Sequence, residues 1–92
     1  MALLRHYYDV VDHNPGCIVL AEVGLFVEAF GDTATLVADV LHLPPPTRMS
    51  GVLATGWPKN HNSGHMDTLH NAGYNVVFVS PMTRCMNRKV GG

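Results

Sequence analysis

Six histidines are the most obvious candidates for chemistry in this sequence. His61 and His65 stand four residues apart, so on a helix they would share one face, as two zinc ligands do. No glutamate follows His61, so this is not a metalloprotease motif. Asp67 or Cys85 would complete a metal site only if the fold happened to place one of them beside these histidines. The simpler interpretation is polar surface histidines, and we predict no metal ion and no cofactor.

A second candidate is an aromatic–carboxylate pair, Phe26 and Glu28, within residues 25–30 (LFVEAF). On a strand, Phe26, Glu28 and Phe30 share one face, and the apolar residues between them share the other. The uniformly apolar face is the natural core face, so Phe26 and Glu28 would point outward together. The alternative is that both phenylalanines belong to the core and Glu28 is simply solvated.

The remaining reactive side chains favour structural roles. Cys17 opens an apolar run and is expected to be a core residue, and whether it pairs with Cys85 is left open. Trp57 lies in a Gly-Trp-Pro turn, where it is either a core residue or an exposed contact residue. The sequence has no serine nucleophile elbow and no close pair of carboxylates, so we expect no enzyme.

The elements that must position these residues follow from apolar periodicity and from Gly and Pro punctuation. Asn14-Pro15-Gly16 should end the first helix, and Asp32 or Thr33 should cap the second. The prolines of residues 43–47 predict a loop or an edge segment. The expected helices are 2–13, 32–42 and 59–72, and the expected strands are 17–23, 25–30, 52–55 (closed by residues 56–58) and 74–79.

Length and composition indicate one small globular domain over residues 1–92, because 47% of the 92 residues are hydrophobic. The order of elements predicts an α/β fold with a mixed sheet of about five to six strands and three helices. The first strand pair should be antiparallel, and residues 52–79 should form a right-handed parallel crossover. Residues 82–92 have no clear preference and are expected to form a flexible basic tail.

Charge is unevenly spread along the chain. Residues 1–44 carry one basic and six acidic side chains, whereas residues 45–92 carry five basic and one acidic. The tail could touch phosphate or could be a solvated terminus. A net charge of −1 argues against strong electrostatic attraction to the phosphates of a nucleic acid. With no apolar run of spanning length and no signal-peptide pattern, we expect no membrane association and a cytoplasmic or nucleoid-associated location.

Several segments, in order, resemble the mismatch-recognition domain at the N-terminus of MutS proteins. Residues 24–34 (GLFVEAFGDTA) resemble the family's Gly-Asp-Phe-Tyr-Glu-x-Phe-x-x-Asp-Ala segment. Upstream, residues 8–15 fall where the family has an aromatic-rich helix and a His-Pro turn. Downstream, residues 55–58 resemble its small-Gly-(Ile/Phe)-Pro motif, and residues 66–77 resemble its Leu-x-x-Leu-x-x-x-Gly-Tyr-Lys-Val-Ala stretch.

This resemblance implies a nucleic-acid-binding module without catalysis. In that family the Phe is a wedge beside a mismatched or unpaired base, and the Glu hydrogen-bonds that base; these roles would fall on Phe26 and Glu28. DNA is the implied partner, and RNA is left open. Basic side chains that would help by contacting phosphate are Arg48, Lys59, Arg84, Arg88 and Lys89. The sequence contains no G-x-x-x-x-G-K-[ST] segment, so we expect no ATPase.

Departures from the family pattern favour a second hypothesis. Leu25 replaces the family's acid, Val27 replaces its aromatic, and Ser80-Pro81 replaces its Glu-Gln pair. A domain with these changes could instead be a protein-interaction or accessory module, encoded by a virus or mobile element, that kept the fold and lost DNA recognition. It could also bind as part of a self-associated assembly.

Overall fold

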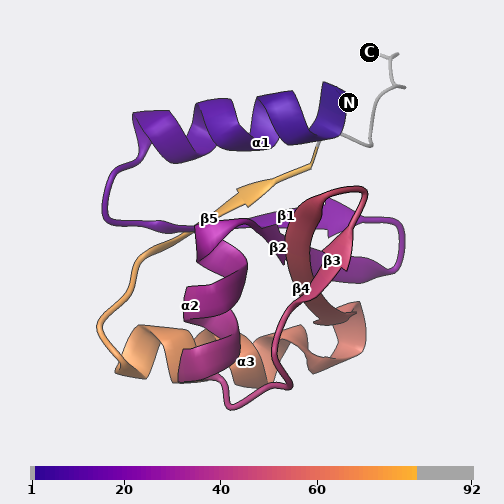
Figure 1. The fold of residues 1–92 in the computed structure, drawn as a ribbon. Coiled ribbons are helices and arrows are strands. Elements are labelled where there is room, and N and C mark those ends of the chain that lie inside the picture. Colours follow the sequence, from indigo (N-terminus) through magenta and orange to yellow (C-terminus); the bar gives the residue numbers. More distant parts are fainter. Residues whose placement is uncertain (1, 81–92) are drawn as a thin grey trace.

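The computed structural model describes residues 2–80 and contains three α-helices, five strands and one short 3₁₀ helix (Figure 1). The predicted order of elements and the mixed α/β fold are confirmed. In chain order the elements are α1 (Ala2–His13), β1 (Ile18–Val23), β2 (Phe26–Phe30), α2 (Asp32–Val40), β3 (Thr47–Met49), β4 (Val52–Pro58), η1 (Lys59–His61), α3 (Asn62–Asn71) and β5 (Val76–Val79). Within this range no helix is long and apolar enough to cross a membrane. The predicted basic tail, including Cys85, lies outside the described residues.

The sheet has the order β3-β4-β2-β1-β5. β1 pairs with β2 in an antiparallel hairpin, β2 with β4 and β4 with β3 are also antiparallel, and β1 and β5 are parallel. It follows that β4 and β5 run in the same direction, as predicted for residues 52–79. The two strands are not neighbours, however, because β2 and β1 lie between them.

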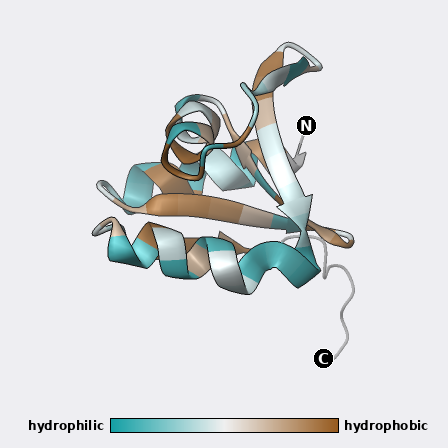
Figure 2. Cartoon of the chain, turned by 90° about the horizontal axis from the view of Figure 1, so that it is seen from below, coloured by the Kyte–Doolittle hydropathy of each residue, from teal (hydrophilic) through white to brown (hydrophobic). Residues whose placement is uncertain are grey.

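Two apolar clusters lie on opposite faces of this sheet. One packs residues of α2 and α3, such as Val37 and Leu69, against Leu20, Val27 and Trp57. The other packs Tyr7 of α1 against the opposite face, and its buried members include Val19, Phe30 and Ala54. Figure 1 shows α1 on one side of the sheet and α2 and α3 on the other. Figure 2, a view from below, shows strongly hydrophobic colouring along part of the sheet.

Glycine rather than an acidic side chain makes the junction between β2 and α2. The predicted cap at Asp32 or Thr33 is wrong: Gly31 is the N-cap, at φ 63°, and no side chain caps the helix. A β-carbon at Gly31 would lie 2.8 Å from the Tyr8 hydroxyl oxygen. The chain therefore turns beneath α1 at a position with positive φ and no room for a side chain, and both conditions suit glycine.

Two predicted boundaries are corrected. Residues 56–58 do not close β4, because the strand continues to Pro58 and pairs with β2 along that whole length. Pro58 is tolerated at the last position of the strand, where it pairs with Phe26. The segment after the prolines forms a short edge strand, β3, joined to β4 by a tight turn at Ser50 and Gly51, both with positive φ.

Tyr7 ties α1 to the sheet. Its side chain is fully buried, and its hydroxyl donates to the Val19 carbonyl oxygen at 2.7 Å and accepts from the Phe30 amide at 3.3 Å. The ring also meets the Phe30 ring edge to face at a centroid distance of 5.2 Å. Burial is the largest cause that raises the Tyr7 pKa. One neutral hydroxyl therefore joins α1, β1 and β2.

Tyr7→Phe should lower the free energy of unfolding by about 1–3 kcal/mol, because two buried backbone groups lose the hydroxyl that they contact. Urea denaturation followed by circular dichroism measures this difference. Tyr8→Phe is the matched control, since Tyr8 is 38% exposed. Equal stability of Tyr7→Phe and the unaltered chain would show that the hydroxyl does not hold the layers together.

Candidate functional site

Phe26 and Glu28 lie on the α1-side face of the sheet, where α1 does not cover it. Along β2, Phe26 is 48% exposed and Glu28 is half-buried, whereas Val27 and Ala29 are in the core on the other face. Phe30 shares the face of Phe26 but is buried beneath Tyr7. The alternative in which both phenylalanines are core residues is therefore wrong for Phe26 and right for Phe30.

Gly56 makes room for Glu28 on this face. The two residues are cross-strand partners on β4 and β2. A β-carbon at Gly56 would lie 2.6 Å from the Val27 carbonyl oxygen and 3.0 Å from Glu28 Cγ. Any larger residue must therefore displace the strand or the carboxylate. This role was not predicted from the sequence, because Gly-Trp-Pro was interpreted as the end of a strand. The signal that could have indicated it is a glycine directly across from the acid on the neighbouring strand.

The carboxyl group of Glu28 has an unusual environment for an acid on a sheet surface. Burial raises its pKa above the ordinary 4.5. Within residues 2–80 no hydrogen bond or ion pair of this carboxylate is found. When ionised it can accept hydrogen bonds, and when protonated it can also donate one. Such a group is better suited to selecting between ligands with different polar edges than to binding any ligand tightly.

Lys59 is the one predicted basic residue in the described chain that joins Phe26. Its backbone amide donates to the Leu25 carbonyl oxygen at 2.9 Å, which ties the end of β4 to the β1–β2 turn. Leu25 is 79% exposed at that turn. We call Leu25, Phe26 and Lys59, which meet where the β1–β2 turn lies beside the end of β4, the tip.

Arg48 does not join the tip. It lies on the edge strand β3, two strands away from β2, and pairs with Leu53. Its guanidinium donates to the Gly51 carbonyl oxygen at 2.9 Å, so it braces the β3–β4 turn. The predicted contacts at Arg84, Arg88 and Lys89 lie outside the described residues.

The other candidates from the sequence have structural surroundings. Trp57 is 3% exposed, and its indole N–H donates to the Asn62 side-chain oxygen at 3.0 Å, so it is a core residue. Its ring meets His65 at 4.8 Å. Burial, and then His61, lower the pKa of His65. No group of three metal-binding side chains occurs among residues 2–80.

Cys17 precedes β1 and is half-buried, which corrects its placement in the core.

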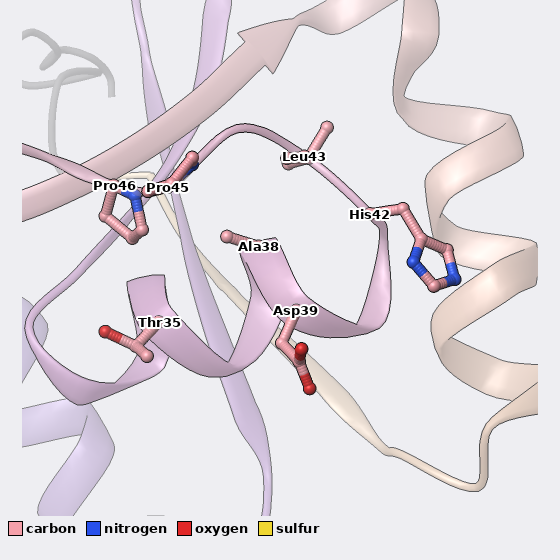
Figure 3. A pocket seen from close by; sticks show the side chains of 7 residues that line it. All are labelled: Thr35, Ala38, Asp39, His42, Leu43, Pro45 and Pro46. Atoms are coloured by element: carbon pink, nitrogen blue, oxygen red, sulfur yellow. The ribbon is translucent and has the colours of Figure 1, made fainter.

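A hollow of about 460 Å³ lies between α2 and the proline-containing loop (Figure 3). In that view Thr35, Asp39 and His42 point in different directions, and the His42 ring is turned toward α3. Polar groups that do not converge cannot hold one ligand. This hollow is therefore not part of the candidate site.

The family model described as MutS domain I matches residues 1–91. Among curated proteins, the chain is similar to the DNA mismatch repair protein MutS of Chlorobium limicola, with 34% identity over 75 residues, covering 82% of this chain and 9% of that protein. It is 30% identical to MutS of Parabacteroides distasonis and 31% identical to MutS of Acaryochloris marina, each over 87% of this chain and 10% of the relative. The chain thus spans about a tenth of the length of these relatives.

Gly56→Ala should destabilise the fold by about 1–3 kcal/mol, because its β-carbon would overlap backbone of the neighbouring strand. Thermal unfolding measures the loss. Gly64→Ala is the control, since a β-carbon at Gly64, inside α3, meets nothing within 4 Å. A Gly56→Ala protein as stable as the parent would show that β4 shifts freely, and that glycine is not required beside Glu28.

Glu28→Gln should be more stable than the parent chain at pH 7, with the difference vanishing at acid pH. Because the folded-state pKa lies above the unfolded value of 4.5, the folded state binds more protons in that window, and stability falls as the pH rises through it. Denaturation at pH 4 and pH 7 tests this. Asp67→Asn, which removes an exposed carboxylate on α3, is the control.

Proposed function

This chain belongs to the MutS domain I family, and on that premise we propose that it is a DNA-binding module that selects mismatched or unpaired bases and carries out no catalysis. One observation carries the proposal: an exposed aromatic, Phe26, stands two residues from a carboxyl group on the part of the sheet face that α1 leaves uncovered. RNA is the less favoured nucleic acid, and its binding is measured alongside that of DNA in the experiment below.

Phe26 would act as a wedge. An aromatic side chain inserted from the minor groove separates neighbouring bases and kinks the duplex, at a cost of a few kcal/mol per base step. A mismatched or unpaired base costs less to unstack than a paired one. Selectivity then comes from how easily the duplex deforms, with no need to identify its sequence. Leu25, exposed at the same turn, adds apolar contact to the wedge.

Glu28 and Lys59 would supply the polar part of recognition. A carboxylate near phosphates is unfavourable unless a base edge donates to it or it takes up a proton, so Glu28 penalises ligands that offer no partner. Its raised pKa makes the protonated form easier to reach. Lys59, tied to the same turn, supplies a cation for a nearby phosphate.

A protein-binding role is the second candidate, favoured by the exposure of Leu25 and Phe26 together and by a formal net charge of −1. Adjacent apolar side chains at a turn fit a partner's apolar pocket as well as they fit a base step. Binding to DNA should weaken steeply as salt rises, whereas an apolar protein contact should not.

Phe26→Ala should reduce the preference for a single-mismatch duplex over a matched duplex by about tenfold, since aromatic stacking on a base is worth about 1–3 kcal/mol. Fluorescence anisotropy at two salt concentrations, with single-stranded DNA and RNA as further arms, measures this. Phe78→Ala is the matched control: Phe78 is a 40% exposed aromatic on β5, away from the tip.

The DNA proposal fails if no nucleic acid binds at tens of micromolar, roughly the range of weak non-specific binding. Binding without any preference between duplexes, equal in Phe26→Ala and in the parent, would keep a nucleic-acid role and remove the wedge.

A further inference from the structure

β5 forms one edge of the sheet, and the backbone groups along its open side have a regular pattern. Within residues 2–80 its one strand neighbour is β1. In their parallel register Ile18 lies beside Val76, and the Ile18 amide donates to the Asn75 carbonyl oxygen at 2.8 Å. Because successive residues of a strand direct their backbone groups to opposite sides, the amide and carbonyl groups of Val76 and Phe78 point away from β1.

The two edges of the sheet differ in how well they are protected from pairing with another chain. β3, at the other edge, is three residues long, includes Arg48 and follows a run of prolines at residues 44–46. Short length, charge and proline all discourage pairing at an edge. β5 consists of valines and one phenylalanine, carries no charge, and has Phe78 40% exposed. In the described part of the chain, β5 is therefore the edge that another strand can join.

We propose that β5 pairs with β5 of a second copy of this chain, antiparallel and about a two-fold axis through Val77, so that two sheets become one. In this register Val76 lies opposite Phe78 of the second copy, and each such pair exchanges two backbone hydrogen bonds. Val77 lies opposite its own copy on the axis. The inference goes beyond the proposed function and does not depend on it.

A second copy is the occupant that this edge fits. The outward groups of Val76 and Phe78 are placed symmetrically about Val77, so a two-fold contact uses the same groups twice. The strand carries no charge, so pairing with its own copy brings no like charges opposite each other. Directly opposite residues share a face of the joined sheet, so the exposed ring of Phe78 gains an apolar neighbour in Val76 of the second copy.

The joined sheet leaves the candidate site uncovered. β1 separates β5 from β2, and Phe26 and Glu28 lie on β2. Each copy would therefore keep its own tip and its own contact with a ligand. Failure of either proposal leaves the other standing, because binding to a duplex and pairing of β5 use different parts of the sheet.

Sedimentation velocity of the full chain, from low micromolar to millimolar concentration and with a reductant present, measures the pairing. The contact is small, so we expect a weak, concentration-dependent dimer. Phe78→Lys places a charge on the edge and should weaken dimerisation by at least about tenfold. This variant should fold, because Phe78 is exposed. Met49→Lys is the matched control, since it adds the same charge at a 56% exposed position on the other edge strand.

Amide hydrogen exchange followed by NMR identifies the strand and the register. As the concentration rises, exchange should slow by about tenfold at the outward amides of Val76 and Phe78. It should change little at Val77 and Val79, whose amides face β1. A chain that stays monomeric at millimolar concentration would overturn the proposal. So would a dimer that Phe78→Lys leaves intact, that Met49→Lys weakens equally, or that protects the amides of β3 instead.

Discussion

The buried hydroxyl of Tyr7 is the interaction on which the exposed site depends. By contacting the Val19 carbonyl and the Phe30 amide at once, it fixes α1 across the end of β2 where the strand leaves the sheet. α1 packs mainly on β1, so it does not cover the other end of β2. Phe30 is therefore buried, while Phe26 and Glu28 on the same face are not. The exposure of these two side chains is a consequence of how the layers pack, and it needs no loop to present them.

Much of the fold was predictable because the relevant signals are local. The α1 boundaries, residues 2–13, follow from one apolar stripe that ends in an Asn-Pro-Gly stop, and the structure has the helix at Ala2–His13. The errors arise where tertiary pairing overrides local preference. Gly56-Trp57-Pro58 resembles a turn, yet it continues as strand because β2 pairs with it and Trp57 fills the core. Similarly, Thr47–Met49 becomes a strand only because β4 lies beside it.

The site was predictable in part for the same reason. Period-two alternation alone placed Phe26 and Glu28 on one face, since a strand's faces depend only on its own sequence. It could not separate Phe26 from Phe30, because burial on that face depends on where α1 docks. Nor could it bring Lys59 to the tip and leave Arg48 apart: Lys59 is placed by a backbone hydrogen bond to Leu25, and Arg48 by its position in the strand order.

The electrostatics of the face favour discrimination over affinity. If the chain binds a duplex as proposed, a net charge of −1 means that little is gained from releasing counterions, and the contact would depend on the shape and deformability of the ligand. Glu28 increases this bias. Gly56 leaves its carboxyl group lying against the sheet with no hydrogen-bond or ion-pair partner among residues 2–80, and burial there already disfavours the charge. A ligand that offers a hydrogen-bond donor, or an acceptor for the protonated form, would relieve that cost. A glycine opposite an acid that has no partner in the described part of the chain is thus the arrangement expected of the selective, weakly binding surface that we propose.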